Sequence, residues 1–375
     1  MRSKINTTRT PGKSGPRPRQ TTTLRMVARE AGVSASTVSR IINGTVNVSN
    51  ELKQAVEAAI EKFDFRPNAA ARGLALGKTL TIGVVAQAID SPFYGEGLRG
   101  IEASLRKRGY APLFMSGNWH EEDEDRCMRE LIARGVDGII VFAGRLSDAK
   151  LRRYANEVSV VVTGRQLRAK GLSSLQIDDR QGAMLAVRHL LELGHRRIAF
   201  INGSENHPDA IERLGGYRKA LEEAGIEFDP KLVAVGDWHE DGGLLATIQL
   251  LDSKANFTAL FCVNDQTAHG ALLGLFRKGL SVPKDVSVVG FDDLPSSAYR
   301  VPPLTSVRQS IGILGEQSAQ AMLDLLAGNR PHLAPPPVEL VIRESTAALR
   351  SSRDQPAAAA NSNSDNLRSA IPTHR

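Results

Sequence analysis

A short segment near the N-terminus, residues 34–43, combines residue types that can recognise the edges of DNA bases. Its predicted helix has one apolar face and one outer face of small polar groups and an arginine, made of Ala35, Ser36, Thr37, Ser39 and Arg40. Small side chains let a helix approach the major groove closely, and an arginine can donate two hydrogen bonds to one guanine. The pattern therefore predicts a helix that binds duplex DNA.

Apolar residues at helical spacing around this segment predict three helices. The first starts after Thr23 and ends at Gly32, the second is capped by Ser34, and the third is capped by Ser49. Two helices joined by a glycine-centred turn and followed by a third are typical of a helix-turn-helix. A three-helix core that binds no DNA, or binds a protein, has the same pattern.

The charge distribution favours DNA over these alternatives. Residues 1–80 contain 14 Lys and Arg against 5 Asp and Glu, a net charge of +9. Residues 81–375 contain 34 against 36, a net charge of −2. The positive charge of the chain is thus concentrated in its N-terminal fifth, as binding to phosphates requires.

Beyond residue 80, strand-like runs alternate with helical runs, which predicts a parallel α/β architecture. Strands are expected at 81–87, 111–115, 137–143, 158–163, 196–201, 231–235, 258–263 and 285–291. Helices are expected near 95–108, 121–134, 180–193, 208–224, 241–252 and 266–278, with a short helix before 158. Two doubly wound lobes of this kind would hold a ligand in the cleft at the carboxyl ends of their strands.

Two further features are interpreted as structural. Gly95, Gly97 and Gly100 match the spacing of a dinucleotide fingerprint, but seven residues separate them from the preceding strand. In a true fingerprint the glycines leave the strand directly, so close helix packing is the expected role. Cys127 and Cys262 lie far apart in apolar surroundings, which predicts buried free thiols and no zinc site.

Composition also bears on location and order. The chain has no apolar run of the ~18–20 residues that span a membrane, and its basic N-terminus lacks the apolar stretch of a signal peptide. We therefore expect a cytoplasmic protein without a membrane partner or a cofactor. Residues 1–21 and 347–375 are expected to be disordered tails. The first is basic and carries no acid, and the second is rich in Ala, Ser and Asn.

Three runs resemble the LacI/GalR (lactose-repressor/galactose-repressor) family of bacterial regulators: VAREAGVSASTVSRIIN at 27–43, VS at 48–49 and RPNAAARGLA at 66–75. The resemblance continues to about residue 346. It implies an all-α helix-turn-helix head with a hinge helix, followed by an α/β periplasmic-binding-protein-like core of two doubly wound lobes. The implied divisions are a basic tail at 1–21, the head at 22–66, the hinge at 67–79, the core at 80–346 and a tail at 347–375.

The resemblance assigns residues that contact DNA. It implies that Arg40 recognises guanine and that Ala35 and Ser36 occupy the variable base-reading positions. Contacts to phosphates or elsewhere on the DNA are implied for Thr23, Leu24, Ser34, Thr37, Ser39, Asn43, Ser49 and Ala71. Leu74 would insert into the minor groove at the operator centre. A hinge of nine residues is too short to form a stable helix alone, so it is expected to order when two copies meet on DNA.

The resemblance also implies a small-molecule effector in the core cleft: a sugar, a sugar acid or a phosphosugar. Arg213 matches an arginine that grips effector hydroxyls or carboxylates, and Asp292 matches an aspartate that accepts hydrogen bonds from hydroxyls. The other implied contacts are Phe93, Tyr94, Arg165, Trp238, Asn264 and Gln309. Taken singly, Arg213 could be a surface charge, Asp292 a turn residue and Trp238 a core residue. Asp265, Asp293 and His195 are interpreted as structural.

These expectations combine into one predicted function. The chain would be a transcriptional regulator, and from the resemblance a repressor, that binds a palindromic operator as a homodimer under control of the effector. A sugar-binding transport protein shares the core fold but would require export. A cleft enzyme is the other alternative, but the chain shows no nucleophile–base pair, metal cluster or phosphate loop. The prediction is therefore that it is not an enzyme.

Overall fold

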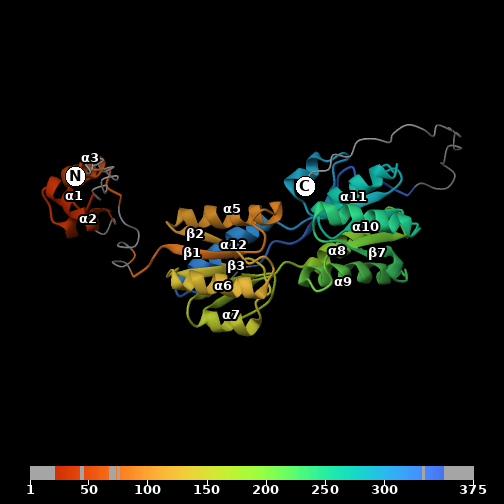
Figure 1. Cartoon of the computed structure of the whole chain (residues 1–375), viewed down its shortest axis with the longest axis horizontal. Helices are drawn as coiled ribbons and strands as arrows, with labels where there is room; N and C mark the ends of the chain where they lie inside the picture. The colour runs from red at the N-terminus through yellow and green to blue at the C-terminus, as the bar shows by residue number, and fades with distance from the viewer. Residues whose placement is uncertain (1–21, 43–45, 67–72, 74–76, 332–333, 350–375) are drawn as a thin grey trace, which may run out of the picture. The chain divides into compact units, whose positions relative to one another are not determined.

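The computed structural model describes residues 22–42, 46–66, 73, 77–331 and 334–349 (Figure 1). The chain divides into two compact units, Met1–Thr79 and Leu80–Arg375. Each unit is described by itself below. None of the described helices is both long and apolar enough to cross a membrane.

The first unit is a three-helix head formed by α1 (Leu24–Glu30), α2 (Ala35–Ile42) and α3 (Asn50–Lys62). Its core contains the buried residues Val27, Ala28, Val38, Val56, Ala59 and Phe65. The hydroxyls of Ser34 and Ser49 accept hydrogen bonds from the amides of Thr37 (3.1 Å) and Leu52 (3.4 Å), which confirms both predicted caps. The predicted cap at Thr23 is wrong, because its side chain makes no capping bond. The start of α1 is exposed, so water can satisfy its amides.

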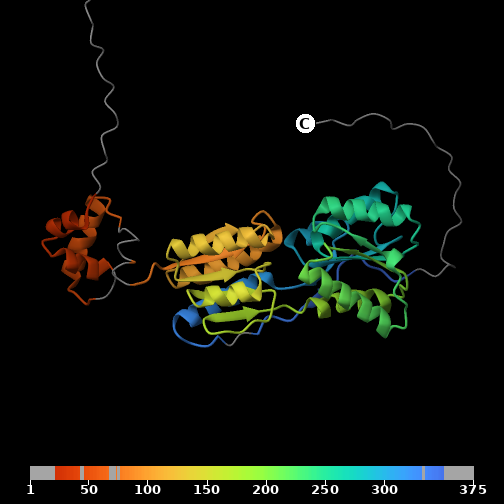
Figure 2. The same ribbon diagram turned by 60° about the horizontal axis from the view of Figure 1, so that its bottom comes forward.

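The first lobe of the second unit, lobe 1, has a five-stranded parallel sheet in the order β2-β1-β3-β4-β5. Its strands are β1 (Thr81–Ala86), β2 (Ala111–Ser116), β3 (Gly138–Val141), β4 (Ser159–Thr163) and β5 (Leu172–Leu175). One face is covered by α5 (Pro92–Lys107) and α12 (Ile311–Leu326), and the other by α6 (Glu121–Ala133) and α7 (Asp148–Ala155). The sheet therefore lies between two helix layers (Figures 1 and 2).

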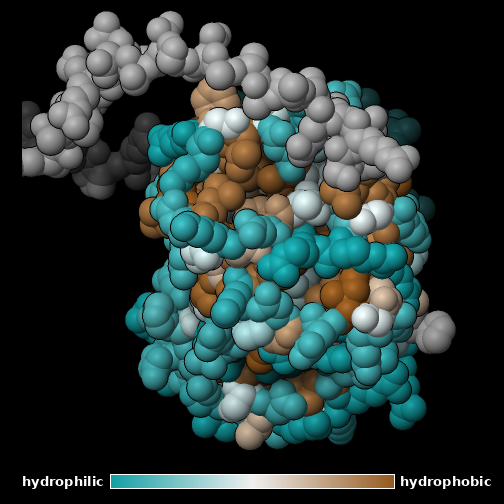
Figure 3. All heavy atoms as spheres, turned by 90° about the vertical axis from the view of Figure 1, so that its right-hand side faces the viewer, coloured by the Kyte–Doolittle hydropathy of each residue, from teal (hydrophilic) through white to brown (hydrophobic). Residues whose placement is uncertain are grey.

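Lobe 2 has a six-stranded sheet in the order β11-β10-β9-β8-β6-β7, parallel except for β11. Its strands are β6 (Ile198–Asn202), β7 (Val233–Val235), β8 (Ala259–Cys262), β9 (Ser287–Asp292), β10 (Thr305–Arg308) and β11 (Glu339–Val341). One face is covered by α8 (Asp179–Glu192) and α9 (Pro208–Glu223), and the other by α10 (Glu240–Asp252) and α11 (Asp265–Arg277). Two 3-10 helices, η1 (Pro230–Leu232) and η2 (Pro295–Tyr299), complete the lobe. The end of lobe 2 in Figure 3 is mostly hydrophilic, with smaller hydrophobic areas between the polar residues.

The chain crosses between the lobes more than once. It leaves lobe 1 after β5, returns after β10 to place α12 on the lobe 1 sheet, and crosses again to add β11 to lobe 2. The predicted alternation of strands and helices is confirmed, but β5, β10, α12 and β11 were not predicted. β5 reads LSSL, and its two serines leave only a weak strand pattern.

The glycines of α5 permit close packing against α12. A Cβ atom on Gly100 would lie 2.2 Å from the backbone oxygen of Gly312, and one on Gly315 would lie 2.1 Å from that of Gly97. The two helix backbones could not approach so closely with larger residues. This contact confirms the packing role predicted for Gly97 and Gly100, whereas a Cβ atom on Gly95 would meet nothing within 4 Å. Cys127 and Cys262 are buried and free, as predicted.

Candidate functional site

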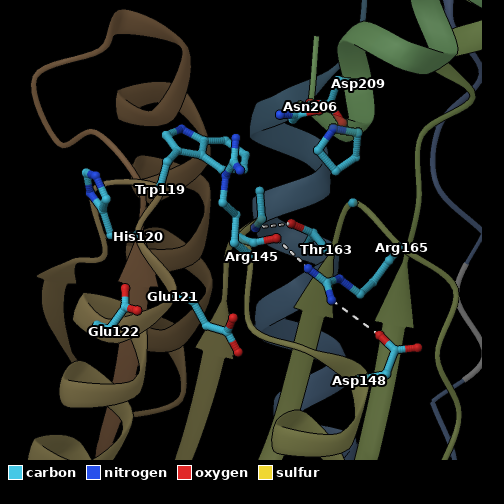
Figure 4. Close-up of a pocket in the computed structure, with 14 residues that line it drawn as sticks. Trp119, His120, Glu121, Glu122, Arg145, Asp148, Thr163, Arg165, Asn206 and Asp209 are labelled. Atoms are coloured by element: carbon cyan, nitrogen blue, oxygen red, sulfur yellow. Dashed lines mark hydrogen bonds and ion pairs between the residues drawn. The ribbon is translucent and has the colours of Figure 1, made fainter. Parts of the chain in front are cut away.

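Two adjoining cavities lie at the carboxyl ends of the parallel strands, between the two lobes. The inner cavity has a volume of about 210 Å³ and is lined by residues that include Phe93, Tyr94, His207, Trp238, Asn264 and Asp292. The outer cavity has a volume of about 590 Å³ and is lined by residues that include Glu121, Glu122, Asp148, Thr163, Arg165 and Asn206 (Figure 4). Trp119, Arg145 and Asp209 line both. This position agrees with the cleft predicted from the strand pattern.

Arg213, on α9, lies behind the Asp292 and Trp238 side chains that line the inner cavity, and it is the charged centre of what we call the cavity floor. It is 2 % exposed, so it is not a surface charge. Its Nε donates to Asp179 Oδ1 at 2.8 Å and its Nη1 donates to the Val263 carbonyl at 2.6 Å. The guanidinium also lies 3.8 Å from the centre of the Phe291 ring. These contacts fix the plane of the guanidinium, which is the geometry a bidentate interaction with a ligand requires.

Asp292 ends β9 and faces the same cavity. Its Oδ1 accepts a hydrogen bond from Gln309 Nε2 at 2.6 Å and lies 3.9 Å from Arg213 Nη1. Its backbone φ is +110°, in a region that side-chain-bearing residues rarely adopt. Burial raises the pKa of the Asp292 carboxyl well above its usual range, although Arg213 opposes this shift. Burial likewise raises the pKa of Asp179 to about 7. The floor therefore combines the fixed guanidinium of Arg213 with the carboxyl groups of Asp179 and Asp292. Ionising these two carboxyl groups would be costly without that cation.

An aromatic cluster crosses from one lobe to the other beside this floor. His207 of lobe 2 lies between Trp119 of lobe 1 and Trp238 of lobe 2, at ring-centroid distances of 4.2 Å and 4.4 Å. Burial lowers the pKa of His207 to about 3, so the ring is neutral at neutral pH. Both tryptophans have positive φ, +57° and +74°, a conformation that costs about 1–3 kcal/mol at each residue. Neither Trp119 nor His207 was predicted, although both follow the carboxyl end of a strand.

The structure brings most of the predicted effector residues together. Phe93, Tyr94, Trp238, Asn264 and Asp292 line the inner cavity, and Arg213 and Gln309 lie beneath it in contact with Asp292. Asn264 caps α11 through the Thr267 amide (2.9 Å), and its Nδ2 donates to the Trp238 carbonyl at 3.0 Å. Its amide thereby positions Trp238.

Two arginines at the carboxyl ends of strands, Arg165 after β4 and Arg308 in β10, have partners within the protein. Arg165 lines the outer cavity, where it donates to the carbonyls of Gly144 and Leu146 and pairs with Asp148 at 3.3 Å. Arg308 lines neither cavity and pairs with Asp293 at 2.7 Å and Glu339 at 2.9 Å. Both cations are therefore largely occupied within the protein.

Two polar residues that were not predicted hold the loops of the outer cavity. Glu124 is fully buried, and its carboxylate accepts hydrogen bonds from the amides of Arg145 and Leu146 at 2.8–2.9 Å. Gln87 donates to the Ala143 carbonyl at 3.0 Å and accepts from the Trp119 amide at 2.9 Å. Burial raises the pKa of Glu124, and the amide bonds counter this shift. Long-range bonds of this kind leave no pattern in the sequence.

Three polar residues interpreted as structural are bonded inside lobe 2. His195 contacts Thr258 (2.9 Å) and the Ala347 carbonyl (3.0 Å) through its ring nitrogens. Asp265 is fully buried and accepts hydrogen bonds from the hydroxyls of Ser297 and Ser306 and from the Leu294 amide. Asp293 forms ion pairs with Arg308 and Arg343. These contacts confirm the structural interpretation. No group of three His, Cys, Asp or Glu within the described residues is arranged to hold a metal ion.

The head places its predicted DNA contacts along α2 and at helix ends. The Ser34 hydroxyl lies 2.7 Å from that of Ser36 and 2.8 Å from that of Thr37, and Arg40 is exposed, with its Nε donating to the Ser36 carbonyl at 3.4 Å. Thr23 and Ser49 are exposed and Ser39 is half-buried, whereas Leu24 and Ala35 pack partly against the core of the head. Asn43, Ala71 and Leu74 lie outside the described residues.

A helix-turn-helix head joined to a two-lobed core with a cavity at its strand ends is the architecture of a DNA-binding protein with a ligand-binding core. Family comparison agrees with this class. Residues 23–68 match the bacterial regulatory proteins of the lacI family, and residues 79–345 match the periplasmic binding proteins and sugar binding domain of the LacI family. The chain therefore belongs to the LacI family of transcriptional regulators.

Individual relatives agree with this assignment. The regulator GalR of Escherichia coli (strain K12) is 38% identical over 310 residues, covering 82% of this chain and 90% of GalR. The regulator CelR of Thermobifida fusca is 36% identical over 333 residues, covering 86% and 96%. A lac repressor dimer bound to operator and the anti-inducer ONPF matches with a TM-score of 0.77 at 30% identity, covering 88% of this chain and 100% of that one. The family, the fold class and the prediction that the chain is not an enzyme are thereby confirmed.

Proposed function

We propose that this LacI-family protein is a repressor that binds a palindromic operator as a homodimer and releases or retains it according to a sugar bound in the inner cavity. The observation that carries the proposal is the buried arrangement of Arg213, Asp179 and Asp292 beneath aromatic rings from both lobes. Ligand hydroxyls can exchange hydrogen bonds with Arg213 and Asp292, and Trp238 can stack on the apolar face of a sugar ring.

The position of the cavity supports control by the ligand. Trp119 belongs to lobe 1, whereas His207, Trp238 and Asp292 belong to lobe 2. A sugar that contacts both sets stabilises one relative arrangement of the lobes, and that difference in binding is what shifts an allosteric equilibrium. A coupling free energy of about 1–3 kcal/mol would change operator affinity roughly 5–150-fold.

The α2 surface supports operator recognition. Arg40 is proposed to recognise guanine, with Ala35 and Ser36 at neighbouring base positions. The DNA backbone or other parts of the DNA would be contacted by Thr23, Leu24, Ser34, Thr37, Ser39, Asn43 and Ser49. Leu74 of the hinge is proposed to enter the minor groove, and Ala71 of the hinge is proposed to contact the DNA. The solved lac repressor dimer bound to operator supports this arrangement by similarity.

Exposed apolar side chains on lobe 2 support the homodimer. Phe276 of α11 is 77% exposed. Tyr299, the last residue of η2, is 86% exposed, and Val301, two residues further on, is 95% exposed. η2 and α11 are in contact, because Ser297 Oγ lies 3.0 Å from His269 Nε2. Leu245 and Leu273 add exposed apolar surface on the packed pair α10 and α11. A second copy would cover such a surface, and two heads would then bind two half-sites.

The proposal is tested by combining two measurements on the full chain. A thermal-shift screen of sugars, sugar acids and phosphosugars should identify a ligand that stabilises the fold by mass action. The same ligand should change the affinity for a palindromic operator selected from random DNA, measured by gel shift at fixed salt. Asp292→Asn should lose the response to the ligand and keep operator binding. If the stabilising ligand leaves operator affinity unchanged in the wild-type protein, the proposed control mechanism is wrong.

The dimer has its own test. Analytical ultracentrifugation should give a dimer for the wild-type chain and a monomer for Val301→Asp, because a charge at the centre of a buried apolar contact is strongly unfavourable. Lys284→Asp changes an exposed residue outside this surface and serves as the control. A monomeric wild-type protein at micromolar concentration would contradict the proposal.

A further inference from the structure

We propose that the outer cavity is a second sugar subsite, so that the cleft binds a neutral carbohydrate of two linked rings. This inference rests on the proposed sugar site in the inner cavity. The inner cavity, about 210 Å³, is smaller than the ~300–1,000 Å³ of typical ligand sites. The outer cavity adds about 590 Å³ and shares Trp119, Arg145 and Asp209 with the inner one. Together the two fall within the usual range for one ligand.

Trp119 is placed where a second ring would stack. Its indole borders both cavities and projects into the pocket drawn in Figure 4. The backbone reaches this position through two consecutive residues with positive φ, Asn118 (+51°) and Trp119 (+57°), held by the bond from the Trp119 amide to Gln87. Such a backbone persists when the surroundings impose it and is common at ligand sites. An indole face binds the apolar face of a sugar ring.

The remaining lining suits hydroxyl groups. Arg145 and Asn206 supply donors, and Glu122 and Asp209 supply acceptors, on the two sides of the outer cavity. The Arg145 side chain points toward Trp119 in Figure 4. The backbone of Arg145 is held in place because its amide donates a hydrogen bond to the Glu124 carboxylate. A sugar hydroxyl both donates and accepts, so it can satisfy both kinds of group at once.

Charge argues against a phosphate or carboxylate in this subsite. The outer cavity is lined by two arginines, Arg145 and Arg165, and by four carboxylates: Glu121, Glu122, Asp148 and Asp209. One of the carboxylates, Glu121, is paired with Lys150 at 3.2 Å. One of the arginines, Arg165, is likewise occupied, because it bonds to backbone carbonyls and pairs with Asp148. An anion would therefore meet more negative than positive charge, whereas a neutral sugar would not.

Isothermal titration calorimetry can separate the two subsites. We expect at least one disaccharide among cellobiose, maltose, lactose and melibiose to bind at least tenfold more tightly than glucose or galactose. Asn206→Ala, at a residue that lines only the outer cavity, should remove that advantage and leave monosaccharide affinity unchanged, whereas Asp292→Asn should weaken both. Asn156→Ala, which changes an exposed asparagine outside both cavities, is the matched control. Equal affinity for monosaccharides and disaccharides would overturn the second subsite alone. No binding by any of these sugars would overturn the sugar site itself.

The two tryptophans of the chain offer an independent readout, because each reports a different part of the cleft. In Trp238→Phe the remaining Trp119 borders both cavities, so its emission should change more with the disaccharide than with the monosaccharide at saturation. In Trp119→Phe the remaining Trp238 borders the inner cavity, so both ligands should give the same change. If Trp119 responds identically to both ligands, the second ring does not occupy the outer cavity.

Discussion

Two neighbouring aspartates with different surroundings give the sharpest test of the site. The Asp292 side chain is 5% exposed, bonds to Gln309 and lies 3.9 Å from Arg213 at the cavity floor. The Asp293 side chain, also 5% exposed, instead pairs with Arg308 (2.7 Å) and Arg343 (2.6 Å). Changing each to asparagine removes one negative charge at almost constant volume. The two variants should therefore separate ligand binding from stability.

Asp292→Asn should affect binding. An asparagine can still accept the bond from Gln309, so we expect the free energy of unfolding to change by less than about 1 kcal/mol. A ligand hydroxyl would lose a hydrogen bond to a charged group, worth ~1.5–3 kcal/mol. At 1.4 kcal/mol for each tenfold change, sugar affinity should fall roughly 10–150-fold.

Asp293→Asn should affect stability. It leaves Arg308 and Arg343 without their carboxylate, but their side chains are 42% and 19% exposed and can still be partly hydrated. We therefore expect a loss of ~1–3 kcal/mol rather than the larger cost of a fully buried broken pair. Sugar affinity should stay within twofold of wild type.

Calorimetric titration with the sugar identified by thermal shift measures the first effect. Urea unfolding followed by tryptophan fluorescence measures the second, since both tryptophans lie in the core unit. If Asp292→Asn binds the sugar as tightly as wild type, or if Asp293→Asn binds it as weakly as Asp292→Asn, the assignment of the cavity floor is refuted.

Three further predictions concern packing, DNA and pH. Gly100→Ala should lower the free energy of unfolding by ~1–3 kcal/mol or more, because its Cβ would lie 2.2 Å from Gly312 O. The Cβ atom of Gly95→Ala would meet nothing within 4 Å, so this variant should raise the free energy of unfolding by ~1 kcal/mol, measured by urea unfolding. Equal effects of the two glycine variants would contradict the packing role. Arg40→Ala should weaken operator binding roughly 5–150-fold in a gel shift at fixed salt, and unchanged affinity would exclude α2 as the recognition helix. Burial lowers the pKa of His269 from 6.5 to about 4, so the folded protein favours the neutral ring. The stability that the neutral His269 ring contributes is therefore present above pH 6.5 and lost as the pH falls toward 4. Wild type should therefore lose more stability than His269→Gln over this interval in pH-dependent thermal unfolding, and parallel losses would contradict this origin.

The sequence was most informative where the pattern is local. Helix caps such as Ser34 and Ser49 act within three residues, so they can be recognised along the chain. The same holds for the alternating strands and helices of the core, whose period reflects one buried face for each element. Elements with weak local patterns, such as β5, were missed.

The candidate site was predictable only where family resemblance marked a residue. Arg213 and Asp292 were identified in this way, although their sequence separation of 79 positions carries no physical signal. Trp119, His207, Gln87 and Glu124 were not identified, because their roles depend on contacts across loops and lobes. Sequence patterns do not show which distant loops meet at the ends of two sheets.

By itself, the sequence determined the basic helix-turn-helix, the two-lobed α/β core, the family and the general position of a cleft. These properties follow from charge, local periodicity and short motifs, which are carried by neighbouring residues. The tertiary structure alone decided that α12 packs on lobe 1, that Arg165 and Arg308 are bonded to protein groups, and that two cavities meet at Trp119. Each of these depends on long-range packing and on competition between partners for the same charge, which no local pattern records.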